Sequence, residues 1–468
     1  MMFSRKKQLR SRELLKFNIN HRLNLLYAAL YVPRLLYFVL WILRPFYERN
    51  ENWLNKTWRY GFLTIGGGIM HPAEMRAYRA GIKAVIDNFK TALAAERNNE
   101  PLAWVEWILN AEIIEAFDIA SFNTESLNIF GNTMGSEYPP ALIAEAESQG
   151  VPVENCSAVK LSVGSYFLKQ IPEPTLIIAA SHPCDSSISV YQILEYLTGV
   201  PTFAYDAPYW KDENSYDYFT KNTWDLIDFL EKQLDKKIDW EKLREVLERV
   251  NEINFYLREV CEMNRAVPCP GTMISLALTW VIREVAVRSP LAVSMANGVY
   301  EATKYRFDKG VGVVKNERVR VLMWFPPIGF FTYIFKWMEH EFGAVVVADF
   351  IGHISTIHIN TETPETMVHD LSRSQLHLGM GRQCHGPVEF IVDELEKMLE
   401  DYSADCVFFM GHNGCKHGWA ALKIIKDFLK KKGMPALYLN LDIMDKRHTS
   451  EQEIKKEITD FFRSHGWA

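Results

Sequence analysis

The sequence predicts an α/β protein with two related, Rossmann-like domains, each built on a parallel sheet, together with a helical N-terminal extension and a helical connector. Two segments far apart in the chain follow one plan of apolar strand, loop with a cysteine, helix, glycine and second apolar strand. A third strand-helix-strand segment lies between them, within residues 318–349. Strands that alternate with helices indicate parallel sheets, because parallel neighbours need a crossover connection that is usually a helix.

The first repeated unit begins with residues 175–180, a short apolar run of the kind that buried strands show. The loop that follows contains Cys184. Residues 187–197 then have apolar side chains at helical spacing, and Gly199 is expected to end that helix. Residues 200–205 are the expected second strand.

The second repeated unit has the same order of elements near the C-terminus. Residues 405–410 are the expected first strand, and the loop that follows contains Cys415. The helix is expected at about 419–432, with Gly433 as its stop, before a strand at 436–441. The unit between the two repeats is expected to consist of a strand at 318–325, a helix at 330–342 and a strand at 344–349.

The length of the chain predicts more than one domain. It has 468 residues, 48% of them hydrophobic, whereas single cores stop growing near about 250 to 300 residues. Residues 46–130 have a mostly helical pattern, and residues 223–263 have a helical and heavily charged one. The expected division is a helical extension at 1–100, a first α/β domain at 101–215, a helical connector at 216–305 and a second α/β domain at 306–468.

Charge and cysteine content argue against two classes of protein. The net charge of −6 gives no reason to expect nucleic-acid binding, because phosphate contacts need clustered Lys and Arg. Seven cysteines, an odd number, without a cleavable signal pattern argue against a secreted disulfide framework. We therefore expect a cytoplasmic protein with no nucleic-acid partner.

Residues 25–43 are nearly all apolar and raise the question of a membrane. Pro33 and Arg34 interrupt this segment, and an arginine at mid-bilayer costs about 2.5 to 3.5 kcal/mol. A membrane span is therefore not expected. The segment is interpreted as an aromatic-rich helix pair that docks on the protein itself, on a partner subunit or shallowly on a membrane surface.

Three cysteines, Cys156, Cys184 and Cys415, each lie where a loop turns into a helix. A thiol at a helix N-terminus feels the positive end of the helix dipole, so its pKa is expected to fall and the metal-binding thiolate to be favoured. Loops that follow parallel strands gather at one edge of a sheet, so Cys184 and Cys415 can meet if the two domains face each other. The pattern indicates a metal-cluster site between the domains, with Cys156 joining from the first.

The other cysteines have different expected places. Cys261 lies in a helical stretch and Cys406 begins an apolar strand, so both are expected in hydrophobic cores. Cys269 lies between two prolines and is interpreted as a loop residue. Cys384, beside His385, is left open as a ligand or a neighbour of the site.

Five short motifs carry a further signal, and they read Asn110-Ala-Glu-Ile-Ile-Glu-Ala-Phe117, Cys156-Ser-Ala-Val-Lys160, Ser181-His-Pro-Cys-Asp185, Tyr205-Asp-Ala-Pro-Tyr209 and His412-Asn-Gly-Cys-Lys416. Together and in this order they resemble the 2-hydroxyacyl-CoA dehydratase and benzoyl-CoA reductase family, in particular subunits like the D-component of 2-hydroxyglutaryl-CoA dehydratase. The resemblance runs from about Trp107 to the C-terminus, and the first hundred residues have no clear counterpart. It implies a 4Fe-4S cluster between two α/β domains, with Cys156, Cys184 and Cys415 as ligands and one iron left open.

The resemblance implies radical chemistry on a CoA thioester. One electron added to the carbonyl of a 2-hydroxyacyl-CoA gives a ketyl radical anion, which expels the 2-hydroxyl group and acidifies the β-proton. The near alternative is the delivery of electrons to an aromatic acyl-CoA, as in a benzoyl-CoA reductase. A hypothesis of another class is an electron-relay or scaffold subunit. A further alternative is a family member with a larger, double-cubane cluster that recruits Cys384 or Cys269.

The same resemblance implies partners. No P-loop motif occurs in the sequence, so ATP is expected to be hydrolysed by a separate ATP-dependent iron-sulfur activator protein. A homologous sister subunit is expected to complete a heterodimer that acts on an acyl-CoA substrate. The His412-Asn-Gly-Cys-Lys416 form looks more like the second member of that heterodimer, which leaves open which of the two chains binds the substrate.

Side chains within these motifs have expected roles. Glu112 matches the carboxylate of the family's Glu-Leu/Ile segment and is the expected base, with Glu115 as the competing position, because a carboxylate in a dry pocket has a raised pKa and exchanges protons usefully. His182 and His412 are expected to donate hydrogen bonds to cluster sulfurs or to the thioester oxygen. The two residues expected to stabilise the negative charge of the cluster are Lys160 and Lys416.

Overall fold

The computed structural model describes a few single residues near the N-terminus and around residue 280, together with residues 71–109, 111–125, 138–273, 289–324, 334–353 and 357–468. The apolar segment 25–43, for which docking was predicted, lies almost wholly outside the described residues. None of the described helices combines the length and apolar character needed to cross a bilayer.

The first sheet consists of β1 (Leu102–Val105), β2 (Ala120–Phe122), β3 (Leu176–Ala180) and β4 (Thr202–Tyr205). All neighbouring pairs are parallel, and the order is β2-β1-β3-β4. Ala103 of β1 lies between Ser121 and Leu176, so β1 and β3 are the central strands. Every residue of these two strands is buried, as expected for a parallel sheet covered by helices.

The second sheet consists of β5 (Val319–Trp324), β6 (Ala344–Asp349), β7 (Cys406–His412) and β8 (Ala436–Leu441). It is also parallel throughout, and its order is β6-β5-β7-β8. Relative to the order in which the strands occur along the chain, this arrangement is the same as in the first sheet. The prediction of two related parallel-sheet domains is confirmed.

The repeated units lie where the sequence predicts them. The first strand of each unit leads into a helix: β3 is followed by α9 (Asp185–Thr198) and β7 by α18 (Lys416–Lys432). Gly199 and Gly433 end these helices with φ values of 66° and 68°, in the left-handed region that a side chain disfavours. The glycine in each unit therefore stops the helix and turns the chain into the next strand.

The prediction of a mostly helical segment at 46–130 is wrong for β1 and β2. Helices do occur there, α4 (Pro72–Asn98) and the short α5 (Ala111–Ala116), but two strands of four and three residues lie beside them. Such short strands have little periodicity of their own. They form because β1 pairs with β3, more than 70 residues away in the sequence, and a local pattern does not report that pairing.

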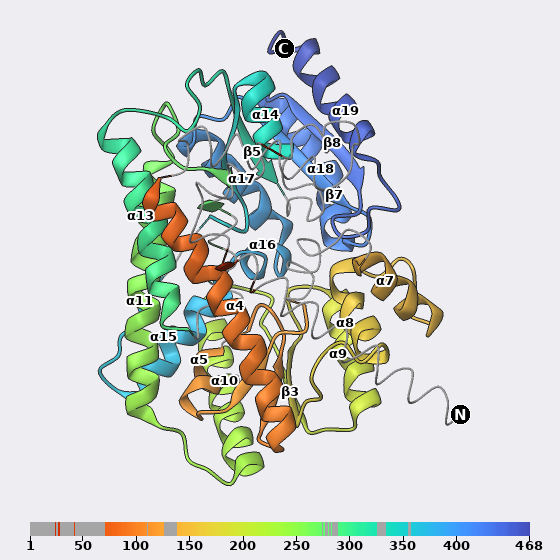
Figure 1. Ribbon diagram of the computed structural model, residues 1–468, viewed down its shortest axis with the longest axis vertical. Helices are drawn as coiled ribbons and strands as arrows, with labels where there is room; N and C mark the ends of the chain where they lie inside the picture. Colours follow the sequence, from red (N-terminus) through yellow and green to blue (C-terminus); the bar gives the residue numbers. More distant parts are fainter. Residues whose placement is uncertain are drawn as a thin grey trace.

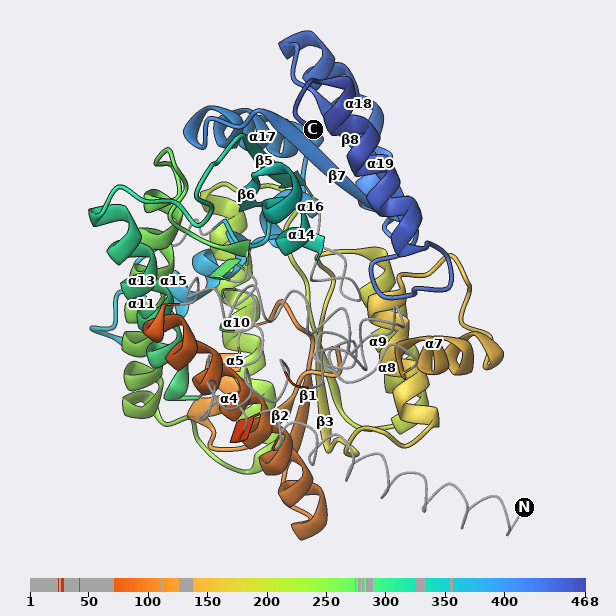
Figure 2. The ribbon, with the colours of Figure 1, turned by 45° about the horizontal axis from the view of Figure 1, so that its top comes forward.

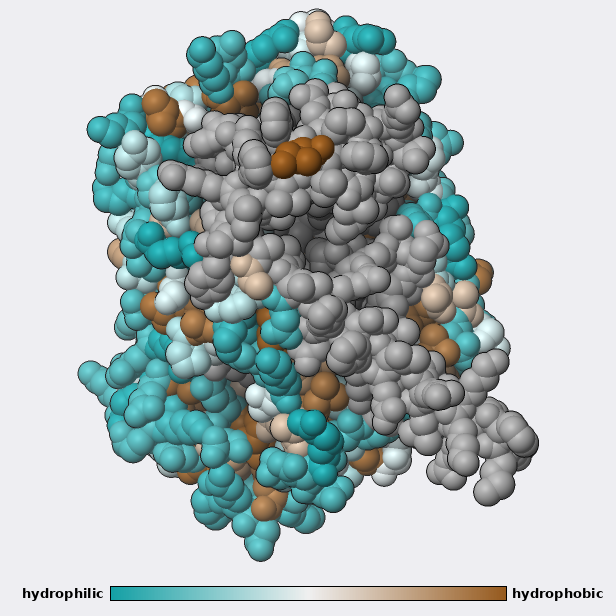
Figure 3. Space-filling view, viewed as in Figure 1, coloured by the Kyte–Doolittle hydropathy of each residue, from teal (hydrophilic) through white to brown (hydrophobic). Residues whose placement is uncertain are grey.

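Helices of the connector form one flank of the molecule. These are α10 (Glu213–Leu234), α11 (Trp240–Met263) and α13 (Leu291–Asp308), and Figure 1 shows α11 and α13 side by side, with α4 beside them. Gly298 allows α13 to approach α4 closely, because a Cβ there would lie 2.6 Å from the carbonyl oxygen of Ala73. The flank carries mostly hydrophilic residues, with hydrophobic ones scattered among them (Figure 3).

One helix crosses the expected division of the chain. α15 (Pro364–Leu376) follows the second sheet's β6 in the sequence but packs against α10. Its Met367 and Leu371 belong to the hydrophobic core around the first sheet. The two units are thereby interlocked.

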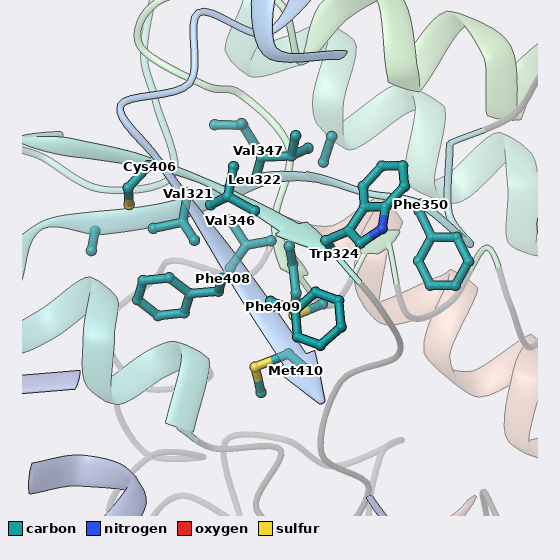
Figure 4. Close-up of a cluster of buried hydrophobic side chains, with 14 of the residues drawn as sticks. Val321, Leu322, Trp324, Val346, Val347, Phe350, Cys406, Phe408, Phe409 and Met410 are labelled. Carbon is teal, nitrogen blue, oxygen red and sulfur yellow. The ribbon is translucent and has the colours of Figure 1, made fainter. Parts of the chain in front are cut away.

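The remaining helices surround the second sheet and the junction, and they are α7 (Tyr138–Ser148), α8 (Ser157–Phe167), α14 (Ile334–Phe342), α16 (Gly381–Cys384), α17 (Val388–Asp401) and α19 (Glu451–Ser464). In the views of Figures 1 and 2 the end of β7 points toward the side of the molecule where α7 and α8 lie. Cys406 lies in the core of the second sheet near Val321 (Figure 4), and Cys261 is also buried in a core. Both placements confirm the prediction.

Candidate metal centre

Cys184 and Cys415 lie at equivalent points of the two sheets. Cys184 follows β3 and immediately precedes α9, and Cys415 follows β7 and immediately precedes α18. In each sheet the order of strands reverses beside these strands, between β1 and β3 and between β5 and β7. Open parallel sheets bind ligands at such switch points, outside the carboxyl ends of the strands.

Cys156 brings the first unit into contact with the loop of Cys415. It immediately precedes α8, so all three cysteines lie at helix starts, as predicted. A Cβ built on Gly414 would lie 2.5 Å from the Cα atom of Cys156 and 2.9 Å from its N atom. Ser157 donates a hydrogen bond of 2.5 Å to Oδ1 of Asp442, just after β8. The junction between the two sheets therefore passes through the predicted ligands.

His412, the last residue of β7, lies against Cys156. Its Nε2 atom is 3.1 Å from Sγ of Cys156, and its Nδ1 atom accepts a hydrogen bond of 3.3 Å from the backbone N–H of Ile443. Burial lowers the pKa of this histidine, and the nearby Asp442 carboxylate opposes that shift. The neutral imidazole therefore carries its proton on Nε2, which donates to the sulfur. His412 thus bonds the sulfur of a predicted ligand, and its predicted bond to a cluster sulfur or to the thioester oxygen stays a prediction.

The pKa values of the three thiols are raised. Burial raises the pKa of Cys156 well above its usual value, and the charges of Cys184 and Cys415 add to the effect. Burial raises the pKa of Cys184 to about 12 and also raises that of Cys415. The predicted lowering by the helix dipole is therefore wrong for the thiols in this structure, because desolvation and mutual repulsion outweigh it.

Thiols are the donors that a 4Fe-4S cluster requires, so the chemistry of this set suits such a cluster. The positive charge of bound iron would favour the thiolate forms, which burial disfavours in all three cysteines. Within the part of the chain that the structure describes, no group of three or more His, Cys, Asp or Glu side chains is arranged to hold a metal ion. The residues that would hold the cluster are Cys156, Cys184 and Cys415.

Cys384 lies in the same neighbourhood, and Cys269 lies elsewhere. Burial raises the pKa of Cys384, and the charges of Cys415 and Cys184 raise it further, so these thiols are close to it. Cys269 is buried in the core under the second sheet, and its backbone N–H donates a 2.6 Å hydrogen bond to Glu317. Of the two cysteines that the sequence left as extra candidates, only Cys384 neighbours the site in this structure.

His182, two residues before Cys184, is fully buried, and neither of its ring nitrogens has a hydrogen-bond partner among the described residues. Burial lowers its pKa to about 3, so the imidazole is neutral. Its ring centroid lies 6.0 Å from that of His385. Buried polar atoms without a partner are rare in folded proteins, so this imidazole is free to bond a group held at the junction.

The two predicted lysines have different surroundings. The Nζ atom of Lys160 is buried and bonds Oε1 of Glu147 at 2.6 Å and the carbonyl oxygen of Val153 at 2.9 Å. Lys160 also lies near enough to His412 for its charge to lower the histidine pKa. Lys416 is exposed. The structure thus places Lys160 in a buried ion pair beside the site and Lys416 at its surface.

The two candidate bases are also separated by their surroundings. Glu112 lies in α5, is buried, and its charge contributes to the raised pKa of Tyr205 at the end of β4. Glu115 forms two hydrogen bonds with Nη2 of Arg249, at 2.6 and 2.7 Å. A carboxylate held by an arginine is a poor proton acceptor, which argues against Glu115 as the base.

A buried carboxylate pair near Cys184 escaped prediction. Glu106 follows β1 and Glu125 lies close after β2, at the same edge of the sheet as Cys184, and both charges raise the Cys184 pKa. Oε2 of Glu106 accepts a 2.8 Å hydrogen bond from the N–H of Ala180. Burial, together with the charge of Glu125, raises the pKa of Glu106. Burial raises the pKa of Glu125 to about 8. A carboxylate that closely follows an apolar strand would indicate such a pair. The sequence does not reveal it, because β1 and β2 are too short to be predicted as strands.

Comparison with known proteins identifies the family of this chain. Residues 106–464 match the family described as 2-hydroxyglutaryl-CoA dehydratase, D-component, a span that contains all three predicted ligands and every strand of both sheets except β1. The chain is 22% identical over 377 residues to a benzoyl-CoA reductase subunit of Thauera aromatica, and the match covers 75% of this chain and 85% of that protein. The chain belongs to the 2-hydroxyglutaryl-CoA dehydratase D-component family.

Proposed function

We propose that this chain is the iron-sulfur subunit of a radical enzyme of the 2-hydroxyacyl-CoA dehydratase type. Cys156, Cys184 and Cys415 would hold a 4Fe-4S cluster, which when bound supplies single electrons at low potential to a CoA thioester. The observation that carries the proposal is the contact of Cys156 with the loop of Cys415 across the two sheets. This contact brings residues with thiols from two separate units to one partly buried junction.

The chain's own residues support the site in three ways. His412 donates a hydrogen bond to Cys156 and so stabilises its thiolate, which the buried surroundings disfavour. The neutral imidazole of His182 offers a donor to a cluster sulfur or to the thioester oxygen. Glu112 is the proposed acceptor of the β-proton, because it is buried and its neighbour Glu115 is bound to Arg249.

The enzyme would need partners. We propose a homologous sister subunit, and the relative from Thauera aromatica, which is itself named as one subunit of a reductase, supports an assembly of several chains. A separate ATP-dependent activator would deliver the electron, since the sequence has no P-loop motif. The proposed location of this assembly is the cytoplasm, with an acyl-CoA as substrate and no nucleic-acid partner.

A second candidate function is that of an aryl-CoA reductase subunit. It is supported by the similarity to the benzoyl-CoA reductase chain, of which the match covers 85%. The dehydratase type remains the first proposal because the family that matches residues 106–464 is described by a dehydratase component. A chain that only relays electrons to its partner would have the same cysteines.

Iron content tests the proposal. Protein purified without oxygen is expected to be brown and to hold about four irons per chain. Cys415→Ala should lose most of this iron, whereas Cys406→Ala, a change in the core of β7, should keep it. Iron near zero in the unchanged protein, or zinc in its place, would refute the cluster.

The reaction is tested on the assembled enzyme, with the sister subunit and activator present. A 2-hydroxyacyl-CoA and benzoyl-CoA are offered separately, and the product decides between dehydration and ring reduction. Glu112→Gln is expected to lower dehydration by about 100-fold or more, the usual contribution of a general base. Glu115→Gln is the matched control, and an equal loss in both variants would argue against Glu112 as the base.

A further inference from the structure

One side chain is bonded to both ends of the short loop that carries Cys184. Glu106, the residue after β1, is 1% exposed. Its Oε2 atom accepts a 2.8 Å hydrogen bond from the backbone N–H of Ala180, the last residue of β3. Its Oε1 atom forms a hydrogen bond with the hydroxyl group of Ser187, in the first turn of α9. The Glu106 carboxyl group therefore links the strand before this loop to the helix after it.

The other side of the loop is bonded to the end of β4. The backbone N–H of Ser181 donates a 2.7 Å hydrogen bond to the carbonyl oxygen of Tyr205, the last residue of β4. The hydroxyl oxygen of Ser181 accepts a 2.8 Å hydrogen bond from the backbone N–H of Ala207. Since β1 and β4 are the two neighbours of β3 in the sheet, the loop of Cys184 is held from both sides, and Glu106 supplies the bonds on the β1 side.

The first turn of α9 also holds the segment of Cys156. The hydroxyl oxygen of Ser186 accepts a 3.3 Å hydrogen bond from the backbone N–H of Cys156. Ser186 and Ser187 are adjacent, so a bond that fixes Ser187 also fixes the acceptor of the Cys156 N–H. Glu106 is thus connected, through this one turn, to the segments of two predicted cluster ligands.

The burial of Glu106 costs free energy, because a carboxyl group removed from water needs hydrogen bonds to compensate for the lost hydration. An apolar side chain of similar size would fill this place without that cost. The bonds to Ala180 and Ser187 are therefore what the carboxyl group contributes here. Groups that hold metal ligands in their orientation matter for the metal, and their loss typically weakens metal binding by about 10- to 100-fold.

We propose that Glu106 is a positioning residue of the metal centre. Its two hydrogen bonds hold the first turn of α9 against the end of β3, so that Cys184 and Cys156 keep the positions in which one cluster binds both. The inference rests on the proposed function, because the cluster is what requires these two cysteines to be fixed. The role depends on hydrogen bonding and not on charge, so a glutamine at this position should fill it.

The test uses the full-length protein and four variants. Glu106→Leu removes both hydrogen bonds, Ser187→Ala removes one of them, and Glu106→Gln keeps an acceptor for Ala180 and a donor for Ser187. Ser372→Ala is the matched control, because this fully buried serine of α15 bonds Thr223 at 2.7 Å and lies outside the loops of the three cysteines. Two quantities are measured: hydrogen exchange of the amides at the start of α9 in iron-free protein, and the rate at which anaerobically loaded protein releases iron to a ferrous chelator.

The amide of Ile188, which donates to the carbonyl oxygen of Cys184, reports on the first turn of α9. In Glu106→Leu and Ser187→Ala this turn is expected to exchange about 10-fold faster or more, because a lost hydrogen bond makes local opening easier by about that factor. Iron release is expected to be about 10- to 100-fold faster in the same two variants. Glu106→Gln and Ser372→Ala are expected to match the unchanged protein in both measurements.

Equally fast exchange in Ser372→Ala would indicate general loosening and would overturn the inference. Unchanged exchange in Ser187→Ala would also overturn it, and this variant keeps the test decisive if Glu106→Leu does not fold. Fast iron release from Glu106→Gln would assign the role to the charge of Glu106 and likewise contradict the inference. Absence of iron from the unchanged protein would refute the proposed function, whereas hydrogen exchange of the iron-free protein would still decide whether Glu106 positions the loop.

Discussion

The Nε2 atom of His412 lies 3.1 Å from the Sγ atom of Cys156, and this contact crosses from the second sheet to the first unit. His412 is the last residue of β7, and Cys156 immediately precedes α8. The N–H of Ile443 donates to the other ring nitrogen, so the imidazole proton is directed at the sulfur. One side chain thus joins the two units and bonds a proposed cluster ligand.

Replacing His412 by leucine should lower the reduction potential of the cluster. The lost hydrogen bond stabilises the more negative, reduced form, and a hydrogen bond to a charged group contributes about 1.5 to 3 kcal/mol. Since about 1.4 kcal/mol corresponds to about 59 mV for one electron, a downward shift of up to about 60 to 130 mV is expected in a spectroscopic redox titration. His412→Gln keeps a donor and should shift the potential less. Equal potentials in all three proteins would contradict this role.

Gly414→Ala should separate the loop of Cys415 from Cys156. The new Cβ would lie 2.5 Å from a backbone atom of Cys156, and backbone cannot move away as a flexible side chain can. Iron incorporation should therefore fall to a small fraction of that in the unchanged protein, as measured after anaerobic reconstitution. Asn413→Ala, at an exposed position of the same loop, is the control and should load normally. Full loading of Gly414→Ala would show that this contact does not hold the site together.

Lys160→Met should destabilise the protein rather than shift the potential of the cluster. The Lys160 side chain is 3% exposed and its partner Glu147 is 21% exposed, so the change leaves a largely buried carboxylate without its main partner. We expect a loss of about 2 to 3 kcal/mol and a lower melting temperature. A potential that falls at an unchanged melting temperature would instead support the charge-stabilising role predicted for Lys160.

Glu125→Gln should remove part of the pH dependence of stability. The Glu125 carboxyl has a pKa of about 8 in the folded protein, against 4.5 as its ordinary value. Between these values the folded protein keeps a proton that the unfolded chain has lost, so stability falls as the pH rises from about 4.5 to 8. The amide has no proton to lose there.

Relative to the unchanged protein, Glu125→Gln should therefore have a higher melting temperature at pH 8 than it has, relative to the unchanged protein, at pH 5. In free energy of unfolding, this relative gain of the variant between pH 5 and pH 8 is expected to be at least about 1 kcal/mol, since one pKa unit corresponds to about 1.36 kcal/mol. Glu154→Gln, at an exposed position, is the control and should follow the unchanged protein at both pH values. If the stability of Glu125→Gln relative to the unchanged protein instead falls between pH 5 and pH 8, the folded protein favours the ionised form of Glu125.

Local pattern was sufficient for the strands of five or more residues. The strand predicted at 436–441 is β8 (Ala436–Leu441), and the glycine stops at Gly199 and Gly433 end the helices α9 and α18. The short strands β1 and β2 escaped because their formation depends on pairing with each other and with β3. Glu106 and Glu125 could not be predicted as site residues either, because what marks them is their position just after these two strands.

The sequence by itself determined the two repeated units and the position of Cys156, Cys184 and Cys415 at helix starts, because helix stops, apolar runs and loop residues act over a few neighbours. Only the tertiary structure decided which groups surround these thiols. It placed His412 on Cys156, put Cys384 beside the other thiols, and raised the thiol pKa values that the helix dipole alone would lower. Burial and contacts between distant segments set these properties, and neither is encoded in a local pattern.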